Sequence, residues 1–447
     1  MDFDAVKDCL IQEANRAGLE EYEVYFMESS GMSTETLKNE ISSFSSGVSG
    51  GVSFRCVVNG KMGSAATELF TEEEMKALVT RAMDGAKYIE NEDRAILYAG
   101  AERYETVKVP ESLIPDAAAV KKIALEIQER TYSESQWITD GTQSGVFCDQ
   151  ISMELMNSHG LHLSHRVSMS GAYAQAVIQK DGESQDAFDF TLNLDSDSLT
   201  AVSSRATQEA LSKVGTVDIS SGKYDVILGG KQMRSLLSAF SPIFSAKNAQ
   251  LGLSLLKGRE GELVANPIVT LMDDPLREDC PMQTAFDGEG VATRRKAVIK
   301  NGVLNTLLYD LATAYKAGVE STGNGQRVGY AENVTIRPYS FYLAGGTVSE
   351  TELRETMGDG VYITELKGLH SGCNAVTGDF SIESAGYKVR NGKLCEAIKS
   401  FTIAGNFFEL LKGIEGMANE VHFGIPSGFT VYGAPDVMIR QMSVAGK

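Results

Sequence analysis

The chain has 447 residues, of which 43% are hydrophobic and 23% charged, so it is long enough for two or three globular domains. Its net charge of −19 disfavours direct binding to nucleic acid, which depends on lysine and arginine. We expect no membrane helix and no signal peptide, because no stretch has the necessary apolar length and the N-terminus lacks a basic and an apolar region. Six scattered cysteines without a Cys-x-x-Cys pair indicate free thiols and a cytoplasmic location.

The N-terminal half mixes helical and strand patterns. Apolar residues recur at helical spacing in some segments and alternate in others, and the period predicts the element. The predicted helices cover residues 4–17, the segments that follow Thr71 and Asp116, and residues 196–214. The predicted strands cover residues 52–58, 151–155 and 161–178. Thr71 and Glu74 have the spacing of a capping box, and Asn59-Gly60 is typical of a type I′ hairpin turn.

The pattern changes near residue 221. A strand is predicted at 224–228 and a helix at 231–240, after which short apolar segments are joined by turns, and a last helix starts at Asn406. Asn301-Gly302 and Asn391-Gly392 repeat the hairpin signal. We therefore expect an α+β protein of two domains, namely an α+β domain over residues 1–220 and a strand-rich, largely antiparallel domain over residues 221–447.

Three of the five histidines, His159, His162 and His165, are evenly spaced and could suggest a metal site. Side chains alternate along a strand, so His162 and His165 point to opposite faces, while His159 falls in a turn. His165 is in phase with the predicted core face. A zinc hydrolase also needs a glutamate beside its histidines, and no histidine in this chain is followed by glutamate. These histidines therefore predict no self-contained zinc-hydrolase site.

The short matches to nucleotide-binding and nucleophile motifs lack the neighbouring residues or secondary structure that these motifs require. None of the five Gly-Lys pairs is followed by Ser or Thr, so there is no phosphate-binding P-loop. Gly323-Asn324-Gly325 follows a helical stretch instead of a strand, which predicts a loop that ends a helix. The Gly-x-Ser-x-Gly pattern at residues 47–51 precedes a strand, where a nucleophile elbow needs a helix. We interpret residues 47–51 as a Gly/Ser-rich hairpin loop.

A Gly-rich loop at residues 368–380 concentrates His370, Cys373, Asn374 and Asp379. Polar loops of this kind often bind ligands. One hypothesis is a cysteine hydrolase that uses Cys373 and His370, which requires both side chains to converge beside an oxyanion donor. The alternative is a polar turn between strands with Cys373 buried, because most free cysteines are packing residues.

The same loop, with other segments in order along the chain, resembles the TldD/PmbA family. In the loop the resemblance is carried by Gly368-Leu369-His370-Ser371-Gly372, Asn374 and Thr377-Gly378-Asp379-Phe380-Ser381. The other similar segments are residues 157–161, 284–293, 301–310, 321–324, 402–406 and 443–447. These ordered matches span essentially the whole chain, which makes the resemblance specific.

The resemblance implies one of two subunit types. TldD-type subunits carry a His-Glu-x-x-x-His zinc motif and a distant cysteine ligand, whereas TldE or PmbA subunits lack them and pair with TldD in a cytoplasmic peptidase. Here Ser238, Ala239 and Ile243 stand where the two histidines and the glutamate would be, and residues 417–447 contain no cysteine. The chain is therefore similar to the TldE/PmbA type, without catalytic or metal-binding residues of its own. Zinc is expected only on a TldD-type partner.

The resemblance also implies a dimer around an internal cavity, in which an unfolded peptide binds extended, as an added β-strand. His370, Ser371, Asn374 and Asp379 are the candidate cavity residues. The expected partner is a TldD-type subunit in a heterodimer, with a homodimer when that subunit is absent. An alternative function, from the family's older description, is a regulatory binding protein that modulates DNA gyrase, which the charge of −19 would suit.

Overall fold

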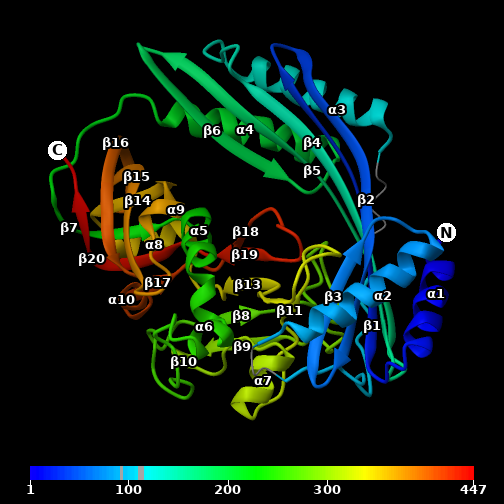
Figure 1. Ribbon diagram of the computed structural model, residues 1–447. Coiled ribbons are helices and arrows are strands. Elements are labelled where there is room, and N and C mark those ends of the chain that lie inside the picture. Colours follow the sequence, from blue (N-terminus) through cyan, green and yellow to red (C-terminus); the bar gives the residue numbers. More distant parts are fainter. Residues whose placement is uncertain (91–93, 109–114) are drawn as a thin grey trace.

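Long antiparallel strands dominate the N-terminal half of the computed structural model, which describes residues 1–90, 94–108 and 115–447 (Figure 1). They form one sheet in the order β3-β2-β1-β4-β5-β6, and every neighbouring pair is antiparallel. The strands are β1 (Tyr22–Leu37), β2 (Glu40–Val58), β3 (Lys61–Thr67), β4 (Gln143–Asn157), β5 (His162–Lys180) and β6 (Glu183–Thr191). The strands predicted at 52–58, 151–155 and 161–178 correspond to β2, β4 and β5.

The predicted N-terminal helices are present, and each begins at a side-chain cap. They are α1 (Phe3–Arg16), α2 (Glu72–Lys87), α3 (Ala117–Glu134) and α4 (Ser196–Ser212). Asp116 accepts a hydrogen bond from the Ala119 amide at 2.8 Å, and Thr71 accepts one from the Glu74 amide at 3.2 Å. The predicted capping box is only half formed, because the Glu74 carboxylate pairs with Arg81 at 2.6 Å instead of returning to the Thr71 backbone.

Alternation along the strands gives the sheet two buried faces. Val24 of β1 packs in a cluster with α1 and α2, whereas the adjacent Tyr25 packs with Phe286 and Tyr339 of the C-terminal half. Farther along the sheet, α3 and α4 pack on a row of small β5 side chains that includes Ala174. The sheet therefore lies between helices and the C-terminal half of the chain (Figure 1).

The prediction of a hairpin loop at residues 47–51 is wrong. This segment lies inside β2 and is paired with β1 along its whole length. The turn between the two strands is at Lys38 and Asn39, whose φ angles are 54° and 61°. A Cβ atom on Gly51 would come within 2.6 Å of the Tyr330 ring. Gly51 therefore permits close packing over a continuous strand, and residues 47–51 form no nucleophile elbow.

Two further sheets make the C-terminal half strand-rich. The order β16-β15-β14-β7-β20 is closed into a small barrel by pairing of β16 with β20, and β17 also pairs with β20. These strands are β7 (Gly222–Leu228), β14 (Gly360–Lys367), β15 (Asp379–Arg390), β16 (Lys393–Asn406), β17 (Ile414–Met417) and β20 (Val437–Ala445). Only the β7–β14 pair of this barrel is parallel.

The second C-terminal sheet has the order β10-β9-β8-β13-β19-β18 and lies between the barrel and the N-terminal sheet (Figure 1). Its strands are β8 (Leu271–Asp273), β9 (Lys296–Lys300), β10 (Val303–Leu304), β13 (Ser340–Leu343), β18 (His422–Phe423) and β19 (Val431–Ala434). A separate ribbon is formed by β11 (Gly325–Gln326) and β12 (Thr335–Ile336). The expected α+β fold, with a largely antiparallel C-terminal part, is confirmed.

Helix α5 (Gly230–Phe240) is the helix predicted at 231–240, and it packs against both C-terminal sheets. A 3-10 turn, η1 (Ser241–Phe244), continues it. The remaining helices are α6 (Ala246–Gln250), α7 (Leu311–Ala317), α8 (Glu350–Met357), α9 (Leu369–Gly372) and α10 (Phe407–Lys412). The predicted last helix is α10, but it ends before Ile414, which is buried in β17 instead.

The three predicted Asn-Gly hairpins are confirmed. Asn59-Gly60, Asn301-Gly302 and Asn391-Gly392 all have positive φ angles and join β2 to β3, β9 to β10 and β15 to β16. Gly323 and Asn324 lie in the loop between α7 and β11, as predicted, and Gly325 begins β11. The six cysteines, all within the described ranges, are free. No helix of the described residues has the length and apolar character to cross a membrane.

Candidate functional site

The C-terminal end of α5 carries the positions where the family resemblance places a zinc motif. Ser238 is exposed, Ala239 is half-buried against the core, and Ile243 is 1% exposed inside the η1 turn. Zinc needs imidazole, thiolate or carboxylate ligands, and none of these three side chains provides one. Ile243 is a packing residue of the main hydrophobic core. The residues present at this end of α5 therefore do not fit a zinc ion.

The signature loop at residues 368–380 lies beside the same helix. Its short helix α9 contacts α5, and the Phe380 ring is 6.4 Å from the Phe240 ring of α5. The loop side chains predicted to face the cavity are all exposed; they are His370, Ser371, Asn374 and Asp379. Their assignment to a peptide cavity stays a prediction.

Two of these residues organise the loop itself. The Asn374 side-chain oxygen accepts a hydrogen bond from the Val376 amide at 2.9 Å. The Asp379 carboxylate accepts one from the Asn406 side chain at 2.9 Å, and this bond lowers the pKa of Asp379. The loop is thus tied to the start of α10, which holds its exposed polar surface in a defined conformation.

Cys373 has the environment of a packing residue. It is half-buried and packs against the main core, and burial raises the pKa of its thiol. A nucleophilic cysteine needs the thiolate, which a raised pKa disfavours. The structure thus supports the packing interpretation over the cysteine-hydrolase hypothesis.

The three evenly spaced histidines are held apart as predicted. His165 is buried and its Nε2 lies 2.7 Å from the carbonyl oxygen of Gln283, while burial lowers its pKa. His162 is exposed on the opposite face and pairs with Glu154 at 2.6 Å. His159 lies in the turn between β4 and β5. Their side chains therefore make separate local contacts and share no ligand position.

Sequence reasoning missed a cluster at the other end of α5, made of Glu350, His422 and Asp436. The His422 Nε2 lies 2.7 Å from Glu350 Oε1, and one ligand atom from each of the three residues lies within 4.8 Å of the others. This hydrogen bond raises the pKa of His422, while burial raises the pKa of Asp436 to about 6. The three residues line a pocket of about 450 Å³. They come from α8, β18 and the β19–β20 connection, so no local spacing in the sequence could indicate them.

A second charged cluster, also missed, lies where β1 and β2 meet the C-terminal half. Glu23 accepts hydrogen bonds from Arg55 at 2.9 Å and from Arg327. Burial raises the pKa of the neighbouring Asp287 and Glu289 carboxyls. Asp287 accepts backbone N–H bonds through both of its carboxylate oxygens. We refer to these five residues as the boundary cluster, and its hydrogen bonds join the two halves of the chain.

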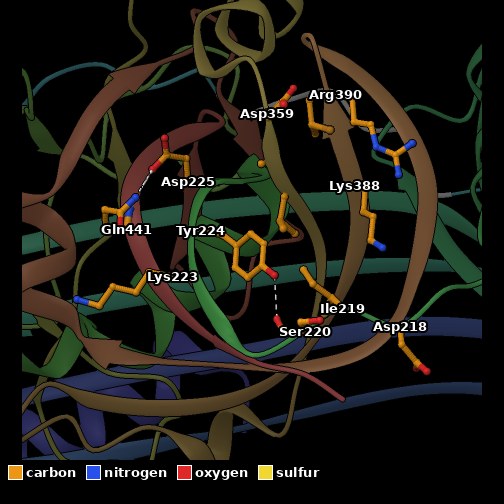
Figure 2. Close-up of a pocket in the computed structure, with 13 residues that line it drawn as sticks. Asp218, Ile219, Ser220, Lys223, Tyr224, Asp225, Asp359, Lys388, Arg390 and Gln441 are labelled. Atoms are coloured by element: carbon orange, nitrogen blue, oxygen red, sulfur yellow. Dashed lines mark hydrogen bonds between the residues drawn. The ribbon is translucent and has the colours of Figure 1, made fainter.

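A polar pocket of about 550 Å³ lies at the barrel (Figure 2). Figure 2 shows Tyr224 near its centre, with Asp225 and Gln441 on one side and Lys388 and Arg390 on the other. Asp225 is paired with Arg440 and with the Gln441 amide. Both acidic and basic side chains line this pocket, so its wall has no dominant charge.

The chain matches sequence models for three domains of one family. The PmbA/TldA metallopeptidase C-terminal domain matches residues 221–446, which are more than half of the 447 residues. Domain 1 of the same family matches residues 22–86, and its central domain matches residues 110–214. The last two models both fall within the single N-terminal domain predicted at 1–220.

Whole-chain comparisons agree with these matches. Metalloprotease PmbA of Escherichia coli O157:H7 is 24% identical over 440 residues, which are 95% of this chain and 92% of that protein. Two solved structures share the fold with a TM-score of 0.89. They are TldE from Thermococcus kodakarensis, at 22% identity, and a Thermotoga maritima protein described as a modulator of a DNA gyrase, at 29% identity. Both structural alignments cover 99% of this chain and 100% of the other chain.

Proposed function

We propose, from the premise that this chain belongs to the PmbA/TldA metallopeptidase family, that it is the non-catalytic subunit of a two-subunit peptidase. A TldD-type partner would hold the catalytic zinc and the general base. The observation that carries this proposal is the C-terminal end of α5, where Ser238, Ala239 and Ile243 replace the two histidines and the glutamate. The structural likeness to TldE supports the same subunit type.

In this proposal the chain forms part of the wall of the peptide-binding cavity and supplies no catalytic residue. The exposed loop at 368–380 would contact an extended peptide through His370, Ser371, Asn374 and Asp379. Backbone hydrogen bonds to such a peptide give affinity with little selectivity for its side chains, which suits a peptidase for unfolded substrates. The free cysteines are consistent with a reducing compartment, so we propose that the two subunits assemble in the cytoplasm.

The partner would dock on the apolar segment that follows η1. Within residues 251–268, five aliphatic side chains are 46–63% exposed: Leu251, Leu253, Leu255, Leu263 and Ile268. Concentrations of exposed apolar surface mark interaction sites in soluble proteins. This segment follows η1 and α6, and Ser254 in it donates a hydrogen bond to the Ile243 carbonyl at 2.5 Å. A subunit docked here would therefore lie near that end of α5.

The decisive experiment mixes the purified chain with a purified TldD-type subunit. We expect a stable complex by size-exclusion chromatography and hydrolysis of an unfolded peptide that neither subunit alone performs. Leu253→Asp should weaken the complex, whereas Val48→Asp, at a 70% exposed position on β2, should not. If the mixture stays dissociated and inert on unfolded peptides, the proposal is wrong.

A second candidate is a regulatory protein that binds DNA gyrase. The 29% identity to a protein described as a modulator of a DNA gyrase favours it, together with the charge of −19. A supercoiling assay with purified gyrase separates the candidates. A change in the supercoiling activity of gyrase on addition of the chain, without any TldD-type subunit, would favour this second function. If supercoiling is unchanged, the peptidase subunit is the better proposal.

A further inference from the structure

The N-terminal end of α5 brings together three side chains of the types that bind divalent metal ions. Glu350, His422 and Asp436 each offer one ligand atom, and these atoms lie within 4.8 Å of one another. Glu350 and His422 are about one-third exposed, with side-chain accessibilities of 32% and 30%. An ion could therefore reach them from solvent through the pocket of about 450 Å³ that they line.

Asp436 supplies an independent indication of a missing ligand. The residue is 1% exposed, and its Oδ1 accepts a hydrogen bond from the Gly230 amide at 2.7 Å. Its Oδ2 is buried and makes no hydrogen bond of standard geometry with the described residues. Burial raises the pKa of this carboxyl, and the nearby Tyr362 hydroxyl only partly offsets that rise. A buried carboxylate oxygen without a partner is costly, and a bound cation is one of the groups that removes the cost.

The fold holds the three side chains in position from three directions. Glu350 is the first residue of α8, whose start is fixed by a reciprocal capping box between Ser349 and Glu352. His422 is paired with Ala434 across the β18–β19 ladder, and Asp436 follows on the same connection. A ligand set fixed by a helix start, a strand and a helix-capping carboxylate is preorganised.

The contact of α5 with His422 depends on the absence of a side chain at Gly230. A Cβ atom there would lie 2.5 Å from His422 Cδ2 and 2.5 Å from the Ala434 carbonyl oxygen. The glycine therefore allows the imidazole to lie directly against the first turn of α5. Arg234, one turn farther along the helix, donates to the Phe423 carbonyl at 2.7 Å and fixes β18 from the same side.

We propose that Glu350, His422 and Asp436 bind one divalent transition-metal ion, of which Zn²⁺ is the best match, with its open coordination positions facing the pocket. One imidazole nitrogen and two carboxylate oxygens are ligands that Zn²⁺ accepts, and three protein ligands leave a fourth position free. Two carboxylates also neutralise the charge of the ion. The His422–Glu350 hydrogen bond would open when the imidazole Nε2 turns to the metal.

This site is separate from the degenerate zinc-motif positions. Gly230 is at the start of α5, whereas Ser238 and Ile243 are at and beyond its other end, roughly 12 Å away at the rise of 1.5 Å per residue. The proposal revises the expectation that this chain binds no metal. That expectation rested on histidine spacing along the sequence and on the family's zinc-motif positions, and neither includes Glu350, His422 and Asp436. It goes beyond the proposed function, which assigns catalytic zinc to the partner.

The test is Zn²⁺ binding by the purified full-length chain alone, after removal of metals with a chelator. We expect isothermal titration calorimetry and elemental analysis to give one Zn²⁺ per chain. Glu350→Gln, His422→Ala and Asp436→Asn should each weaken binding by at least about tenfold, since even changes outside the ligand shell cost that much. His162→Ala is the matched control, because His162 also pairs with a glutamate, at 2.6 Å, but lies outside the cluster. It should leave binding unchanged.

A second measurement excludes binding by the free cysteines. Co²⁺ added to the wild-type chain should give a spectrum of nitrogen and oxygen ligation, without the charge-transfer band of a cobalt thiolate. This needs no variant, so it is informative even where a substitution impairs folding. The proposal is overturned if the chain binds no Zn²⁺, if the thiolate band appears, or if all four variants bind equally. These measurements use the chain without a TldD-type subunit, so neither outcome decides whether the chain is a peptidase subunit. The mixing experiment with a TldD-type subunit tests that proposal separately.

Discussion

The boundary cluster and the cluster at the start of α5 both contain buried carboxylates, but these carboxylates differ in their hydrogen bonding. In the boundary cluster, both carboxylate oxygens of Glu23 and of Asp287 accept hydrogen bonds. At the start of α5, Oδ2 of Asp436 makes no hydrogen bond of standard geometry with the described residues and lies in the wall of a pocket. A charge cluster whose groups are all paired joins parts of the fold, whereas one with an unpaired buried oxygen is suited to a ligand.

Raised carboxyl pKa values do not distinguish the two clusters. Burial raises the pKa of Asp287 and Glu289 in the boundary cluster and of Asp436 at the start of α5. Such shifts are enriched at functional sites, yet structural networks produce them too. The hydrogen-bond inventory of each oxygen therefore carries more information here than the direction of the shift.

The largest effect should come from removing the central carboxylate of the boundary cluster. Glu23→Gln leaves the buried guanidinium of Arg327 without its ion pair, so we expect a loss of about 3–5 kcal/mol in the free energy of unfolding. Urea denaturation measures it. Glu72→Gln, which breaks an exposed ion pair with Lys76, should leave the free energy of unfolding nearly unchanged. Equal costs for the two variants would show that the cluster does not join the two halves.

The next effect tests the start of α5 through its backbone. Gly230→Ala places a methyl group 2.5 Å from His422 Cδ2 and the Ala434 oxygen, and should destabilise the chain by about 1–3 kcal/mol. It should also weaken Zn²⁺ binding, because His422 must move. Gly85→Ala in α2 is the control: its nearest neighbour atom is 3.7 Å away, and alanine there should stabilise by about 0.5–1 kcal/mol. Thermal unfolding of both variants should therefore shift in opposite directions.

A pH titration of stability separates the clusters further. Burial, and then the charge of Asp287, raise the pKa of Glu289. The folded chain thus keeps a proton that the unfolded chain releases above about pH 4.5, so the wild-type chain loses stability as the pH rises from there toward neutrality. Glu289→Gln removes this loss and should gain more than about 1 kcal/mol relative to wild type between about pH 5 and pH 7.5.

The control for this titration is Glu73→Gln, at an exposed carboxylate on α2. Its unfolding free energy should run parallel to that of the wild-type chain across the same pH range. Parallel curves for Glu289→Gln as well would contradict the assignment of a raised carboxyl pKa to the boundary cluster.

The smallest of these effects on stability is expected at one of the three proposed metal ligands. Asp436→Asn keeps a side-chain oxygen for the Gly230 amide and removes the unpaired charged oxygen, so its unfolding free energy should stay within about 1 kcal/mol of wild type. Urea denaturation of the metal-free chain measures this. A loss as large as that of Glu23→Gln would mean that Asp436 belongs to a structural cluster.

Local features of the fold were predictable because their causes lie within a few residues. Asp116 and Thr71 cap helices through the third following amide, and Asn-Gly pairs form hairpins because both residues adopt positive φ. The prediction for residues 47–51 was wrong. One reason is that Gly51 packs against Tyr330, which is distant in the sequence.

The candidate sites were predictable only in part. The absence of a zinc motif at Ser238, Ala239 and Ile243 follows from residue types at known positions, so the sequence and the family resemblance suffice. His422 meets Glu350 and Asp436 only after a helix, a short strand and a strand connection have come together. Glu23 and Arg327 are likewise joined across the two halves of the chain. Such contacts leave no periodic signal for sequence reasoning to detect.

The pairing that closes the barrel determines when the barrel can fold during synthesis of the chain. Strand β7 pairs with β20, with Gly222 opposite Val444, and β20 also pairs with β16. Strand β7 leaves the ribosome well before β20, so the barrel can close only after β20 has been synthesised. Ser221 then holds Gly446 through two hydrogen bonds at 3.0 and 3.1 Å. A chain cut before Ser443 would therefore lack the β16–β20 pairing and carry an open barrel with an unpaired edge, which is a target for aggregation or degradation.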